Sequence, residues 1–143
     1  MTTNQDADIL LRLYELRREE RMRKGRAFLI STFAAQNFAE YTSKYPPGSD
    51  ENALLRQVIT YWEMAASLVN YAAIDEKLFF QNNSEHFVVW EKIKHLVPEM
   101  REAYKNPILF RNLESVAGRY QQWITSEAPE AVEALRARLG IKK

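Results

Sequence analysis

The sequence predicts an all-α fold, a single-domain bundle of about six or seven helices over residues 1–143. Strong helix-forming residues make up about half of the chain, and only four glycines occur in it. No long run alternates apolar and polar residues, so no strand is indicated. The apolar fraction of 46% is sufficient for a buried core at this length. We expect the helices to surround a central apolar helix.

The first expected helix covers residues 6–26 and is strongly charged. Apolar residues in 9–16 recur at i, i+4 and i+7, which is the spacing of one helix face. Residues 17–26 read RREERMRKGR, so the apolar stripe stops there. This contrast predicts that the second half projects from the bundle or covers a solvent-facing side. Gly25 is expected to mark a kink or a break.

The central helix is expected over residues 49–74. Pro46-Pro47-Gly48 is the clearest helix breaker in the chain, and it ends an aromatic helical region at residues 27–45. Ser49 or Asp50 can then cap the helix that follows. Because this helix is apolar on most sides, we expect neighbouring helices to surround it in water.

Beyond the central helix, Asp75 is expected to cap a short helical turn. Ser84 or Asn83 can cap the next helix, which we expect to end near Lys105. Pro98 lies inside that segment, where it either starts a fresh turn or kinks the helix.

The last two helices are predicted from prolines and a glycine. Asn106-Pro107 has the form of an N-cap followed by proline in the first helical position, so it is expected to open a helix. Pro129 is expected to open the final helix, and Gly140 to lie at its C-terminal end.

Composition excludes several classes of function. The chain has no cysteine, which excludes thiol catalysis, disulfides and cysteine-bound metal centres. Twenty basic and nineteen acidic residues nearly cancel, unlike the charge of a globally basic nucleic-acid binder. No nucleotide-binding glycine motif occurs, and we expect no cofactor. The N-terminus lacks a signal-peptide layout, so we expect a cytoplasmic location.

No membrane span is expected either. The most apolar segment, residues 53–74, contains Arg56, Glu63 and several polar side chains. Burying the two charges in lipid would cost about 3 kcal/mol each, even on the scale derived from insertion experiments. The segment therefore fits a helix inside a protein better than one inside a bilayer.

A polar stripe follows one side of the central helix. Polar groups on a buried helix need partners, which gives two interpretations. The stripe could line a small-molecule or enzymatic pocket with Glu63 as its charged group. Alternatively, Glu63 pairs with an arginine from another helix, or the stripe faces a second subunit; we favour this structural interpretation. The candidate residues are Arg56, Thr60, Tyr61, Glu63, Ser67 and Asn70.

Residues 17–26 are a second candidate site, because six basic residues outnumber Glu19 and Glu20 there. Nucleic acid or an anionic membrane surface could bind such a run. No aromatic residue is interleaved in it, so we favour a solvated, salt-bridged helix over nucleic-acid binding. The candidate anion-binding residues are Arg17, Arg18, Arg21, Arg23, Lys24 and Arg26.

Glu91, His95 and Glu99 are spaced i, i+4, i+8, so on a straight helix they could offer three metal ligands. Pro98 disturbs that helix, and no second ligand motif accompanies the first. Glu91 and His95 are therefore only weak metal candidates, and we expect no metal. The other histidine, His86, is expected at the surface or at the start of a helix.

Several segments together resemble an uncharacterised bacterial family known only as a domain of unknown function. The segments are YWEM at 61–64, LFF at 78–80, VWEKI at 89–93 and NPILFRNLE at 106–114. The similarity extends from about Leu10 to Leu139. The resemblance implies an all-helical domain but no activity and no catalytic residue. Some similar proteins place membrane helices ahead of this domain.

The function that these observations favour is protein–protein interaction. We expect a scaffold domain that forms a homodimer, with a further, unidentified protein partner as an additional expectation. The alternatives are a ligand-binding or enzymatic bundle with its polar site near Glu63, and anionic-surface binding through residues 17–26. No nucleophile motif is recognisable, so we do not favour an enzyme.

Overall fold

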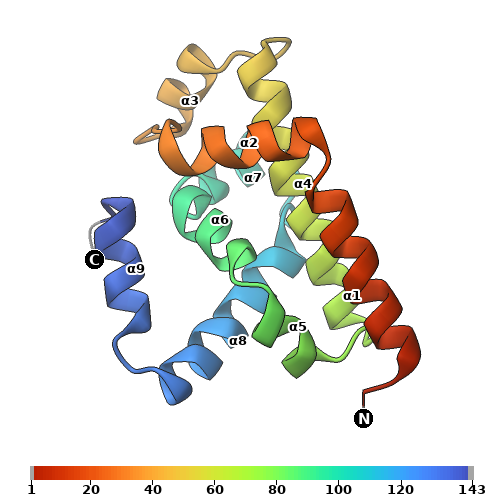
Figure 1. Ribbon diagram of the computed structural model, residues 1–143. Coiled ribbons are helices and arrows are strands. Elements are labelled where there is room, and N and C mark those ends of the chain that lie inside the picture. Colours follow the sequence, from red (N-terminus) through yellow and green to blue (C-terminus); the bar gives the residue numbers. More distant parts are fainter. Residues whose placement is uncertain (1, 142–143) are drawn as a thin grey trace.

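The computed structural model describes residues 2–141, and all of the regular secondary structure in this part of the chain is helical (Figure 1). The all-α prediction is therefore confirmed. The described residues form nine helices, more than the six or seven expected. They are α1 (Asn4–Arg17), α2 (Glu20–Ser31), α3 (Phe38–Lys44), α4 (Asp50–Asn70), α5 (Glu76–Asn82), α6 (Glu85–Ile93), α7 (Val97–Ala103), α8 (Arg111–Glu127) and α9 (Ala131–Leu139).

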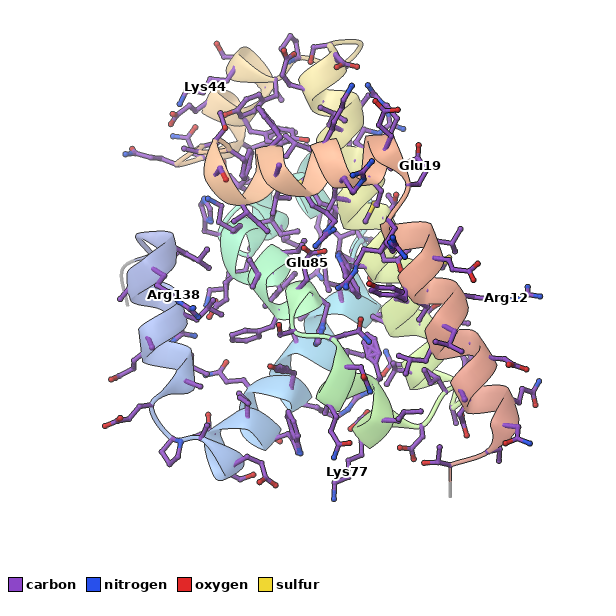
Figure 2. The ribbon with its side chains drawn as sticks, viewed as in Figure 1. Arg12, Glu19, Lys44, Lys77, Glu85 and Arg138 are labelled. Carbon is purple, nitrogen blue, oxygen red and sulfur yellow. The ribbon has the colours of Figure 1, made fainter. Side chains whose placement is uncertain are left out.

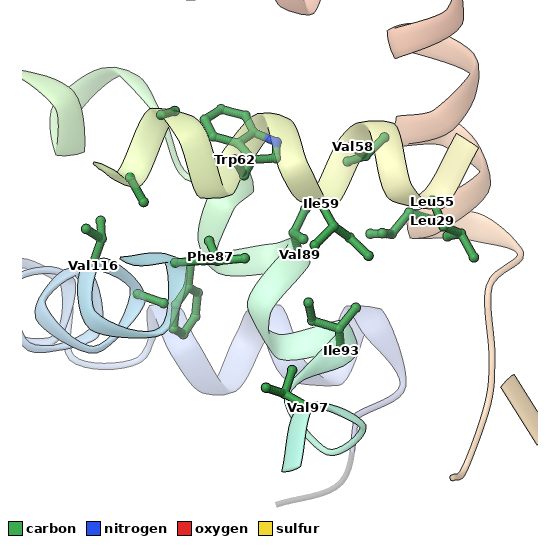
Figure 3. Close-up of a cluster of buried hydrophobic side chains, with 14 of the residues drawn as sticks. Leu29, Leu55, Val58, Ile59, Trp62, Phe87, Val89, Ile93, Val97 and Val116 are labelled. Carbon is green, nitrogen blue, oxygen red and sulfur yellow. The ribbon is translucent and has the colours of Figure 1, made fainter. Parts of the chain in front are cut away.

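Helix α4 is the centre of the fold, as the apolar segment predicted. It packs against α2, α8 and α6, and its buried side chains face all three (Figure 3). Val58 and Trp62 are completely buried, as are Leu29 of α2 and Val116 of α8. The core is thus a layer of branched aliphatic and aromatic side chains between α4 and the helices around it. Within residues 2–141, no helix has the length and apolarity that crossing a membrane requires.

The expected continuous helix over residues 6–26 is wrong. The chain turns between α1 and α2, which follow different directions in Figure 1. The side chain of Glu19 makes this break by accepting hydrogen bonds from the backbone N–H groups of Arg21 and Met22, both at 3.0 Å. Glutamate is uncommon as an N-cap, so the usual capping residues did not reveal the boundary.

Helix α2 does not project into solvent but crosses α4. Gly25 lies inside α2, is buried, and allows the two helices to come close. A Cβ atom at this position would lie 2.6 Å from Cγ2 of Val58 and 2.9 Å from the carbonyl oxygen of Leu54. Gly25 is therefore a packing residue and not the kink or break that the sequence suggested.

Several predicted helix boundaries are confirmed. Ser49 caps α4 by accepting the N–H of Asn52, and Asp75 caps α5 by accepting the N–H of Leu78. Gly140 ends α9 with a φ of 70°, in the left-handed region that glycine adopts readily.

Pro98 starts a fresh helical turn, which was one of the two alternatives for it. The segment expected from Ser84 to Lys105 is thereby divided into α6 and α7, and Pro98 lies in the first turn of α7. Another boundary differs from expectation. Asn106-Pro107 does not open α8 but forms a separate turn, and α8 begins at Arg111.

Candidate functional site

Glu63, the first-choice functional residue, connects α4 to the N-terminus of α8. One carboxylate oxygen accepts the backbone N–H of Leu113, and the other accepts the side-chain amide of Asn112, both at 2.8 Å. The residue before α8, Phe110, supplies no side-chain cap and has a left-handed φ of 59°. Glu63 thus serves as the missing cap from another helix, where a carboxylate also meets the positive end of the helix dipole.

A chain of hydrogen bonds continues from this cap along the contact between α4 and α8. Asn70 donates to the side-chain oxygen of Asn112 at 2.8 Å and accepts from Arg119 at 2.6 Å. Arg119 also forms an ion pair with Glu76 of α5 at 2.8 Å. The network joins three helices, and both oxygens of Glu63 are already used in it. This geometry supports the structural interpretation of Glu63.

The remaining residues of the predicted stripe do not converge on one place. Tyr61 donates its hydroxyl to the carbonyl of Leu13, so it holds α1 against α4. Burial raises the pKa of Tyr61 to about 12, which keeps this hydroxyl protonated as a donor. Thr60 and Ser67 bond to carbonyls of their own helix, and the side chain of Arg56 is exposed.

The sequence did contain a signal for the partners of this stripe. Asn112, Ser115 and Arg119 lie at i, i+3 and i+7 in α8, so they occupy one side of that helix. Ser115 accepts a hydrogen bond from Arg119 at 2.6 Å. Two polar stripes on neighbouring helices are the pattern that predicts such a network, and only the stripe on α4 was recognised.

The basic run at residues 17–26 is divided between α1 and α2, and Arg18 and Arg23 line one surface hollow together with Glu15 and Glu19. On α2, Arg21 forms an ion pair with Asp50 at 2.9 Å, and Lys24 contacts Glu20 at 3.5 Å. The guanidinium groups of Arg17 and Arg18 lie 5.5 and 5.4 Å from the ring centre of Tyr14. Arg23 is exposed on the outer side of α2.

Arg26, the last residue of the run, points into the protein. Its Nε lies 2.7 and 2.8 Å from the two carboxylate oxygens of Glu85, whose side chain is only 9% exposed. Trp62 donates its indole N–H to the same carboxylate at 3.0 Å. One buried carboxylate therefore ties α2, α4 and α6 together (Figure 2).

Glu91, His95 and Glu99 do not share a face, because α6 ends at Ile93 and Glu99 belongs to α7. Glu91 is buried and forms an ion pair with Arg136 of α9 at 2.6 Å, and a second one with Lys94. His95 bonds to the carbonyl of Ala35 at 2.6 Å. Among the described residues, no group of three histidine, aspartate or glutamate side chains is arranged to hold a metal.

His86 lies at the start of α6, which was one of the two alternatives for it, but it is in the core and not at the surface. Its ring is completely buried, and the ring centres of Tyr120 and Phe79 lie 5.0 and 5.1 Å away. Phe80 stacks on it with an interplanar angle of 8°. Neither ring nitrogen has a hydrogen-bond partner within the described residues. A histidine at the start of a helix gave no sign that it would be enclosed by aromatic rings.

This burial predicts that acid destabilises the protein well before its carboxylates are protonated. Desolvation lowers the pKa of His86 to about 3, whereas in the unfolded chain it is about 6.5. The unfolded state therefore binds more protons below pH 6.5, and stability falls with pH in that window. We expect the free energy of unfolding to decrease by about 2 kcal/mol between pH 7 and pH 5.

Urea denaturation at pH 5, 6 and 7 measures this effect. The variant His86→Phe keeps an aromatic ring in the same enclosure but has no titratable group. It should therefore show little change in stability over this range. If the parent protein and the variant lost stability equally, His86 would not be the cause.

The fold and the buried charges define an all-helical domain in which polar side chains join helices to one another. The chain belongs to the family described as DUF4760, a domain of unknown function, whose profile matches residues 2–120. This confirms the resemblance to an uncharacterised helical family, although the match ends inside α8 and does not reach Leu139. No curated protein and no solved structure matches the chain significantly.

Proposed function

We propose that this chain is an interaction domain that forms a homodimer through the outer face of α1. The observation that carries the proposal is the exposure of large apolar side chains on this helix. Leu11 and Tyr14 lie at i and i+3 on the same side of α1 and are 58% and 49% exposed, whereas Leu16, 55% exposed, lies on another side of the helix. Exposed apolar surface gathered on one element is typical of an interaction site.

Hydrogen bonds also hold helix α1 in place against the rest of the protein. Besides the bond from Tyr61 to Leu13, Asp6 accepts the backbone N–H of Asp75 at 2.9 Å. Asp6 forms a capping box with Thr3 at the start of the helix. A preorganised helix loses little conformational entropy when a partner binds.

The charges on α1 favour a second copy of the chain as the partner. Asp8 lies in the first half of the outer side, whereas Arg18 follows the end of the helix. Glu15 and Arg12 lie between them, and Arg12 extends away from the protein in Figure 2. Two such helices in antiparallel arrangement bring Asp8 of each copy toward Arg18 of the other. The face is therefore complementary to itself.

The oligomeric state tests the proposal. Because one helix per subunit buries less than a standard interface, we expect a weak dimer with a dissociation constant of about 1–100 μM. Sedimentation equilibrium should show the monomer–dimer transition for the full chain. The substitution Leu11→Glu should shift the protein to monomer, whereas Ile108→Glu, at a residue 55% exposed elsewhere, should leave the dimer intact.

The orientation is tested by exchanging charges. Asp8→Arg should weaken the dimer, and the double substitution Asp8→Arg with Arg18→Asp should restore it. A parent protein that stays monomeric at 1 mM would refute the dimer. A cytoplasmic location remains part of this proposal.

A further inference from the structure

A pocket of about 470 Å³ lies between the α2–α3 connection, the end of α6 and the end of α9. Its volume is within the usual range of small-ligand sites, about 300–1,000 Å³. Leu139 and Ile141, both partly exposed, are apolar members of its lining, whereas the lining residue Phe33 is only 2% exposed. The pocket is far from the outer face of α1 along the fold, and it includes residues of α9 that the family profile does not cover.

Among the described residues that line this pocket, Lys92 is a cation without an acidic partner. Its ammonium group donates to the carbonyl of Phe33 at 3.0 Å, which uses one of its three N–H donors. No carboxylate from residues 2–141 forms an ion pair with it. Burial lowers the pKa of Lys92, and no acidic group opposes this effect. A half-buried ammonium without a counter-ion favours an anion beside it.

The other charged groups of the pocket do not supply that anion. Glu91 also lines it, but its carboxylate is held between Arg136 and Lys94. His95 uses Nε2 on the carbonyl of Ala35, so that nitrogen is a donor and Nδ1 is left as an acceptor in the neutral ring. Among the described lining residues, Lys92 is therefore the charged group that no side chain of opposite charge pairs with.

We propose that this pocket binds a monocarboxylate with a short apolar chain. The carboxylate pairs with Lys92, and the chain lies against Leu139 and Ile141. One ammonium group matches a single negative charge. A phosphate monoester would require more donors, such as an arginine fork or a glycine-rich cradle, and the described part of the lining provides neither.

Titration of the ¹⁵N-labelled full chain with sodium octanoate tests this inference by NMR. We expect saturable shifts of the amides at residues 34–36 and at Gly140, which lie on the two sides of the pocket. Octanamide has the same chain without the charge and should bind at least about tenfold more weakly. Equal binding of octanamide, or no saturable shift with octanoate, would overturn the proposal. Tighter binding of octyl phosphate would overturn the assignment to a carboxylate.

Substitutions in the pocket test whether octanoate binds there. Lys92→Met keeps the aliphatic stem and should weaken octanoate binding about tenfold or more. Lys77→Met, at an exposed lysine on α5, should leave the affinity unchanged. Leu139→Trp should abolish binding by filling the pocket, and it keeps the test valid if Lys92→Met does not fold. Unchanged affinity in either folded pocket variant would refute the site. The α1 dimer does not enter this test, so the two proposals can fail separately.

Discussion

Replacing Arg26 by methionine is expected to destabilise the protein by about 3–5 kcal/mol. The substitution keeps most of the side-chain volume but leaves Glu85 buried without its cation. A buried carboxylate that loses its partner retains the full desolvation penalty, and only the indole of Trp62 would still bond to it. Urea denaturation at pH 7 measures the loss.

Two further variants separate the buried ion pair from a general effect of removing arginine. Arg23→Met, at an exposed position on the same helix, should change stability by no more than about 0.5 kcal/mol. Adding Glu85→Gln to Arg26→Met should recover part of the loss, because the uncompensated charge is then gone. If Arg26→Met cost no more than Arg23→Met, the buried pair would not hold the helices together.

Gly25→Ala is expected to reduce stability by about 1–3 kcal/mol, although alanine is the better helix former. The added methyl group would lie 2.9 Å from the carbonyl oxygen of Leu54, which belongs to the backbone of α4 and cannot rotate away. The two helices must therefore separate, which loosens the packing on both sides of the crossing. Thermal and urea unfolding measure the loss.

The matched control is Gly118→Ala on α8. A Cβ atom at Gly118 meets no atom within 4 Å, so only the helix propensity changes. This variant should be more stable than the parent by up to about 1 kcal/mol. Both substitutions replace glycine by alanine inside a helix. If both changed stability in the same direction, the close approach of α2 and α4 would not explain the effect of Gly25→Ala.

Features that depend on neighbouring residues in the sequence were predictable. The double proline before α4, the caps Ser49 and Asp75, and the apolar surface of the central helix were all recognised from spacing and residue type. Gly140 was also placed correctly at the end of α9. The all-α class follows from the same local signals, because each helix was favoured by its own composition.

Features that depend on distant contacts were not predictable. His86 and Gly25 owe their positions to rings and backbone from other helices, which no local pattern records. The partner of Glu63 was sought among arginines, whereas it is the N-terminus of α8. Similarly, Arg26 was grouped with exposed cations, although its partner Glu85 lies 59 residues away in the chain.

The cap that Glu63 provides for α8 bears on the order in which the protein folds. The first turn of α8 has no capping side chain of its own, and the carboxylate that completes it lies 50 residues earlier in the sequence. That turn gains its full stability only after α4 has docked, because an uncapped end frays in water. Since α4 is synthesised before α8, we expect the first turn of α8 to become ordered when it contacts Glu63 on α4, and this contact fixes the residue at which α8 begins.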